Sequence, residues 1–328
     1  KKKQKIEYIV DNRKYENTNF LSDVIDQSDE KSTGEVIEKM IEIKDNLVEG
    51  VVGNLADKDN KFLTSSTSES AGLIKEKIFE TIVAKETDKS ASILSKVMSK
   101  SDIATISSVI NNITEKNTNE VSKLSLKEMA DFSEKNPKKL EILNQNNTDQ
   151  IEKLTISAIE EAESSQEDAD LIAKVVAVAS DELVNKMVEE VSKNSTDEKQ
   201  TLSAQVLKAI VDIDSDKIEI INDDIKDTMI KQTIESAQNQ QEGTGVQQDQ
   251  DMTSIVSDII VNSNTETGSK MIEELNNSST NTENDLSLQV ISDISEKDTT
   301  KLNTLSENNK EQIDKLTETA IKNADASE

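Results

Sequence analysis

Apolar residues recur along this chain at intervals of three, four or eight positions, separated by polar stretches. One such stripe holds Leu94, Val97 and Met98, and the next begins at Val109 and Ile110. This spacing places the apolar side chains on one face of a helix, whereas a half-buried strand alternates at every second position. The pattern therefore predicts an all-α protein built from short amphipathic helices.

The stripes also repeat as a group. Residues 123–140 match residues 285–302 at nine of 18 positions, and at the same offset residues 150–159 match residues 312–321 at seven of ten. Two further copies align on their apolar columns, so that each of four copies holds about five helices in roughly 65–75 residues. Stacked repeats of this kind predict an α-solenoid, in which each copy buries its apolar face against the next.

The repeat defines the expected organisation of the chain. The predicted segments are a non-repeat stretch at 1–19, copy 1 at 20–85, copy 2 at 89–163, copy 3 at 167–238, a polar Gln/Gly loop at 239–250 and copy 4 at 251–325.

The turn before the fourth helix of each copy carries a capping residue. The aligned positions are Asp59, Asn136, Asp214 and Asp298. Side-chain oxygens of Asp and Asn accept hydrogen bonds from free N–H groups in the first turn of a helix. Pro137 follows Asn136 at the first helical position, where its missing N–H costs nothing.

The helix spacing over the whole chain resembles that of armadillo/HEAT-like helical repeats. It is also similar to the short-helix arrays of bacterial magnesium transporter and flagellar motor switch proteins. The resemblance implies an α-solenoid fold and transfers no functional residue to this chain.

Several kinds of chemistry are excluded by composition. The chain has no cysteine, histidine or tryptophan, which removes zinc–thiolate sites and Ser–His–acid catalysis. The run Asp212, Asp214 and Asp216 imitates the start of a calcium loop, but Lys217 stands where the sharp turn needs glycine. We interpret this run as a helix cap beside two solvated acids, and we expect no enzyme activity, no metal site and no cofactor.

The charge balance bears on partners. Lys+Arg number 38 against 66 Asp+Glu, which gives a net charge of −28 with a single arginine, Arg13. Such acidity repels phosphate backbones, so we expect no nucleic-acid partner. No stretch approaches the length and apolarity of a membrane span, so we also expect no membrane insertion.

Two functional hypotheses remain. The last helix of copy 4 is as apolar as its interior counterparts, and the chain ends soon after it, so this face is expected to meet another copy or a longer parent array. The self-association residues would be Ile313, Leu316, Ala320 and Ile321. The first hypothesis is thus a structural scaffold or filament subunit that associates end to end. The alternative is a solenoid that binds a basic protein or peptide on an acidic face.

Overall fold

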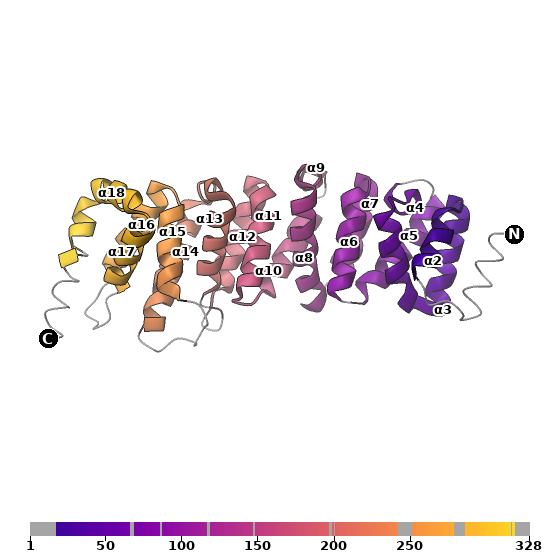
Figure 1. Ribbon diagram of the computed structural model, residues 1–328, viewed down its shortest axis with the longest axis horizontal. Helices are drawn as coiled ribbons and strands as arrows, with labels where there is room; N and C mark the ends of the chain where they lie inside the picture. The colour runs from indigo at the N-terminus through magenta and orange to yellow at the C-terminus, as the bar shows by residue number, and fades with distance from the viewer. Residues whose placement is uncertain are drawn as a thin grey trace. The chain divides into compact units, whose positions relative to one another are not determined.

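The computed structural model describes residues 18–65, 69–85, 87–116, 119–146, 148–196, 199, 201–241, 251–278, 286–315 and 317–318. Throughout these residues the regular structure is helical, which confirms the all-α, helical-repeat fold predicted from the sequence (Figure 1). The chain divides into two compact units, Lys1–Glu161 and Ala162–Glu328.

The first unit contains copies 1 and 2. Its helices are α2 (Thr18–Asp26), α3 (Glu30–Asp57), α4 (Lys61–Thr64), α5 (Glu69–Val83), α6 (Asp88–Lys100), α7 (Ile103–Lys116), α8 (Asn119–Lys135), α9 (Pro137–Asn146) and α10 (Thr148–Glu160). In one row α6 packs between α3 and α8, and in a second row α7 packs between α5 and α10. The short helices α4 and α9 connect the two rows.

The second unit contains copies 3 and 4 in the same arrangement. Its helices are α11 (Gln166–Val178), α12 (Asp181–Asn194), α13 (Leu202–Asp214), the 3₁₀ helix η1 (Ser215–Ile218), α14 (Asp223–Gln241), α15 (Met252–Asn262), α16 (Thr265–Ser278), α17 (Leu286–Lys297) and α18 (Thr299–Asn308). Helices α11, α13, α15 and α17 pack in succession as the first row, and α12, α14 and α16 form the second.

The predicted apolar columns form the cores of both units. Leu94, Val97 and Met98 of α6 are each at most 1% exposed, as are Ile172, Val175 and Val176 at the aligned positions of α11. Methionines occupy the same columns as the aliphatic residues: Met40, Met98, Met187, Met229 and Met271 are all fully buried. They fill the core and do not form a binding surface.

Copy 1 departs from the five-helix pattern, because its second and third helices are one continuous helix, α3. The apolar columns explain the difference. Leu47 stands seven positions after Met40, whereas in copy 2 Leu124 stands eleven positions after Ile113. Seven residues make two helical turns and keep the stripe in phase, while the four missing residues leave no room for a loop.

Two local predictions need correction. The cap of the fourth helix in copy 1 is Asn60 and not Asp59: the Asn60 side chain accepts from the Phe62 N–H at 3.2 Å, while Asp59 takes a left-handed φ of 54° in the turn that ends α3. The expected loop at 239–250 begins later, because α14 continues to Gln241. The rest of that loop, 242–250, lies outside the described residues. The boundaries of the copies stay a prediction.

Candidate binding cleft between α5 and α7

The outer face of α7 differs from the equivalent helices of the other copies. Where α12 and α16 carry glutamates, at Glu182 and Glu266, α7 carries Ala104. Three further columns on this side of α7 show the same loss of charge, and of their residues in α7 Asn111 is exposed, Ser108 is half-buried and Asn112 is buried. Ser108 aligns with Glu35, Lys186 and Lys270; Asn111 aligns with Glu38, Glu189 and Glu273; Asn112 aligns with Lys39, Glu190 and Glu274. This departure is confined to one copy, which makes the face a candidate for a role beyond stacking.

This neutral face forms one wall of a cleft, and α5 forms the other. The cleft has a volume of about 330 Å³ and is lined by Glu76, Glu80, Ala104, Ser107, Ser108, Asn111 and Asn112. Glu76 and Glu80 lie one turn apart on α5, and both are exposed. Glu76 stands where copies 2, 3 and 4 have Lys153, Lys231 and Lys315. The charge at this one position of the wall is therefore reversed relative to the other copies.

Hydrogen bonding makes the cleft rich in acceptors. The Ser107 hydroxyl donates to the carbonyl oxygen of Ile103 at 2.9 Å, and the Asn112 side-chain NH₂ donates to the carbonyl oxygen of Ser108 at 2.9 Å. These donors serve the backbone of α7 itself. The Asn112 amide oxygen and the two carboxylates accept hydrogen bonds, so the cleft suits a ligand that supplies donors and positive charge.

One lysine in each of copies 2, 3 and 4 donates hydrogen bonds to backbone carbonyls at the end of another helix. Lys139 donates to the carbonyl oxygens of Ser99 and Ser101 at 2.7 and 2.9 Å, at the C-terminal end of α6. Lys217 and Lys301 make the same contact with the carbonyl oxygens of Ala179 and Ser263, which follow α11 and α15. The cation meets the negative end of the helix dipole and satisfies carbonyls that have no partner within the helix.

Burial accompanies this lysine contact. Desolvation lowers the pKa of Lys139 and of Lys301 below the ordinary lysine value, and the nearby Asp102 and Asp298 carboxylates oppose that shift. Copy 1 has Phe62 in place of the lysine. The three lysines are half-buried, and each donates to backbone carbonyl oxygens within its own copy.

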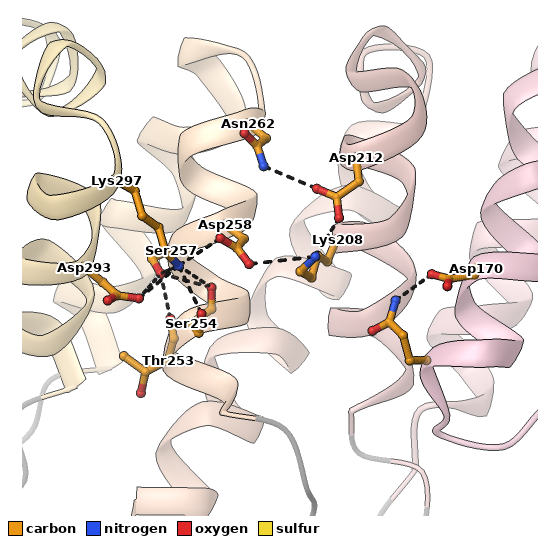
Figure 2. A network of polar contacts seen from close by, with 11 residues as sticks. Asp170, Lys208, Asp212, Thr253, Ser254, Ser257, Asp258, Asn262, Asp293 and Lys297 are labelled. Carbon is orange, nitrogen blue, oxygen red and sulfur yellow. Dashed lines mark hydrogen bonds and ion pairs between the residues drawn. The ribbon is translucent and has the colours of Figure 1, made fainter.

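A second set of lysines joins copies 3 and 4 along the first row. Figure 2 shows this network on α13, α15 and α17. Lys208 bonds Asp212 at 2.6 Å and reaches Asp258 of the next copy at 3.8 Å. Lys297 pairs with Asp258 at 2.8 Å and with Asp293 at 3.1 Å. Asp258 is thus shared between a lysine of copy 3 and a lysine of its own copy.

The same network brings a serine and a lysine together. Lys297 donates to the Ser257 hydroxyl oxygen at 3.0 Å, and that hydroxyl donates to Asp293 at 2.7 Å. A lysine base for serine must be neutral. Burial alone lowers the pKa of Lys297, but hydrogen bonds and the charges of Asp258 and Asp293 outweigh it and raise the pKa. Ser257 is fully buried, so this pair has a structural role.

The predicted self-association residues are mostly beyond the described part of the chain. Leu316, Ala320 and Ile321 lie outside it. Ile313 is half-buried, as is its counterpart Ile74 in copy 1, whereas Ile151 and Met229 are fully buried. The prediction of an end-to-end contact therefore stays a prediction.

The described residues hold neither a metal-binding cluster of acids nor a membrane-spanning helix. No group of three or more aspartates or glutamates there has the arrangement of a metal site. Asp214 caps η1 through the Asp216 N–H at 3.2 Å, in keeping with the interpretation of the aspartate run as a helix cap. None of the described helices combines the length and apolarity that crossing a bilayer requires.

The cleft itself was missed by sequence reasoning. Its signal is present, since the segment Ile103–Thr114 has no charged residue in a chain that is 32% charged. What the sequence alone did not give is that α5 and α7, which are not consecutive helices, lie side by side.

No protein-family model and no curated protein sequence matches the chain. Among solved structures, it is similar to the RNA-binding domain of yeast Puf5p bound to MFA2 RNA, with 9% identity and a TM-score of 0.29 over 92% of this chain and 97% of that one. A likeness at this level transfers no function to this chain. Because that neighbour binds RNA, it contradicts our expectation that nucleic acid is excluded as a partner, and we withdraw that expectation.

Proposed function

We propose that the protein is a non-enzymatic helical-repeat scaffold that binds a basic segment of a protein partner in the cleft between α5 and α7. The observation that supports this most directly is the reversal at Glu76, where the other copies have lysine. Together with Glu80 it places two carboxylates beside a wall of hydroxyl and amide groups. Carboxylates in a partly enclosed cleft bind ammonium or guanidinium groups through charge-assisted hydrogen bonds.

The neutral wall on α7 contributes selectivity. A lysine at position 108, as in copies 3 and 4, would pair with the carboxylates from within. Ser108 and Asn112 instead place uncharged side chains in the wall opposite Glu76 and Glu80. The cleft volume of about 330 Å³ has room for one or two basic side chains of an extended segment.

The test uses the full chain and a fluorescent lysine/arginine-rich peptide, with an acidic peptide of the same length alongside. We expect the basic peptide to bind with an affinity that falls as salt rises. Glu76→Lys, which restores the repeat residue, should weaken binding at least tenfold. Glu273→Lys makes the same charge change at an exposed position of α16 and should leave affinity within about twofold.

Two results would overturn the proposal. Equal losses in Glu76→Lys and Glu273→Lys would show that net charge, and not the cleft, drives binding. The same assay also includes a labelled single-stranded RNA. If that RNA bound and its binding depended on Glu76, RNA would replace the basic polypeptide as the ligand. End-to-end association stays a separate prediction that rests on the apolar stripe of the last helix.

A further inference from the structure

One buried carboxyl stands out in the core of the first unit. Glu128 of α8 is 2% exposed, and its Oε2 atom has no hydrogen-bond partner. The aligned residues in the other copies are Val51, Val206 and Val290, and each of them is fully buried. A position that is valine in three copies is thus an acid in one.

Glu128 lies where ionisation would affect the packing of several helices. Helix α8 packs against α6 in the first row and against α10, α9 and α7. It therefore lies within the packing of copy 2, where the other copies have an apolar contact. A neutral carboxyl can be held there at moderate cost, but a carboxylate without a partner is far more expensive to bury.

Among the described residues, no charge on the surrounding helices neutralises Glu128. On α6, Lys96 pairs with Asp57 at 3.0 Å, and on α9, Lys139 is held by backbone carbonyls. The described side chains of α7 are uncharged, and the described charged residues of α10 are not buried. The charge that acts on Glu128 is the like charge of Asp131, one turn further along α8, which pairs with Lys135 at 3.3 Å.

We propose that Glu128 is a proton-operated latch: α8 is docked in copy 2 while the carboxyl is protonated, and its docking weakens when the carboxyl ionises. Desolvation, reinforced by Asp131, raises the pKa of Glu128 well above the ordinary glutamate value. The folded state therefore binds a proton that the unfolded state has released. This stabilisation of the docked state is fully present below the unfolded-state pKa of about 4.3 and is lost progressively as pH rises from there through the folded-state pKa.

The test measures hydrogen exchange of α8 in the full chain between about pH 5 and about pH 8, corrected for intrinsic chemical exchange. For a single proton, the opening constant of α8 should rise about tenfold per pH unit while Glu128 stays protonated in the docked state. Glu128→Val and Glu128→Gln should both remove this rise. Glu141→Gln, at an exposed position of α9, should keep it.

The outcomes are distinguishable. A wild-type α8 that opens equally across this pH range would overturn the latch. So would a Glu128→Val protein with the wild-type response, because the proton would then act elsewhere. Should Glu128→Val perturb the fold, Glu128→Gln keeps the shape of the side chain and decides the question.

Discussion

The ammonium group of Lys139 lies 2.9 Å from the carbonyl oxygen of Ser101, the residue that ends α6. Lys139 belongs to the fourth helix of its copy and Ser101 to the end of the first. One side chain therefore connects the fourth helix of a copy to the C-terminal end of its first helix. The same contact recurs at Lys217 and Lys301, so copies 2, 3 and 4 share it.

Replacing that lysine should destabilise the fold. We expect Lys139→Met to lower the free energy of unfolding by about 1–2 kcal/mol, because two carbonyls lose a charged donor at a helix C-terminus. Urea unfolding of the full chain measures the change. Lys138→Met is the matched control, since the adjacent side chain is exposed. Equal losses in both variants would show that the cap contributes nothing specific.

The sequence made part of this contact visible. The lysine follows the cap by three positions in Asn136-Pro-Lys-Lys139, in Asp214-Ser-Asp-Lys217 and in Asp298-Thr-Thr-Lys301. Local helical rules predict the cap, because it bonds its own first turn. They do not predict the lysine's partner, which lies 38–40 residues away and depends on how the fourth helix meets the first.

The same distinction explains the other successes and failures. Core columns such as Leu94 and Ile172 follow from periodicity, which is local and repeated. The shorter interval between Met40 and Leu47 is visible in the sequence. It does not by itself decide between a short loop and two further turns of a continuous helix, so the fusion of α3 was not predicted. The burial of Glu128 was not predicted, because helical periodicity identifies core positions from apolar residues and does not identify an acid at such a position.

The Asp293 contacts give the fold a pH dependence on the acid side. Its hydrogen bond from Ser257, and then Lys297, lower the pKa of this carboxyl. The stabilisation is present above the unfolded-state pKa of about 3.9 and is lost as pH falls through the lower folded-state pKa. We expect Asp293→Asn to reduce stability at neutral pH by less than about 1 kcal/mol, since the side chain is partly solvated.

The measurement is thermal unfolding of wild type and Asp293→Asn from neutral to acidic pH. The two curves should converge at low pH, where wild-type Asp293 is protonated as well. Glu273→Gln, an exposed change on the neighbouring α16, provides the reference for loss of a carboxylate. A constant gap between wild type and Asp293→Asn at all pH values would contradict the assignment.

Copy 3 lacks the Ser–Asp–Lys contact that copy 4 makes with Ser257, Asp293 and Lys297. Its aligned residues are Ala173, Ala209 and Ile213, of which the last is 46% exposed. Ala209→Asp alone should destabilise the protein by about 2–4 kcal/mol, because it buries a charge without a partner. Ile213→Lys alone should change stability by less than about 0.5 kcal/mol at its exposed position.

Combining these substitutions tests whether the contact is transferable. Adding Ala173→Ser and Ile213→Lys to Ala209→Asp should recover at least about 1 kcal/mol of the loss, because the carboxylate then gains both partners found in copy 4. Urea unfolding of the single, double and triple variants gives the coupling energy. Strict additivity would mean that copies 3 and 4 do not share this geometry.

End-to-end association can be tested without knowing a partner. If the apolar stripe of the last helix joins chains, sedimentation of the wild type should show assemblies that grow with protein concentration, and added salt should favour them by screening the net charge of −28. Ile321→Lys should abolish this growth, because a charge would have to be buried in the contact. Leu73→Lys makes the same change on α5, where the side chain is already 59% exposed, and should leave assembly intact. A wild type that sediments as a monomer at every concentration and salt would eliminate the filament hypothesis and leave the cleft of α5 and α7 as the surface to pursue.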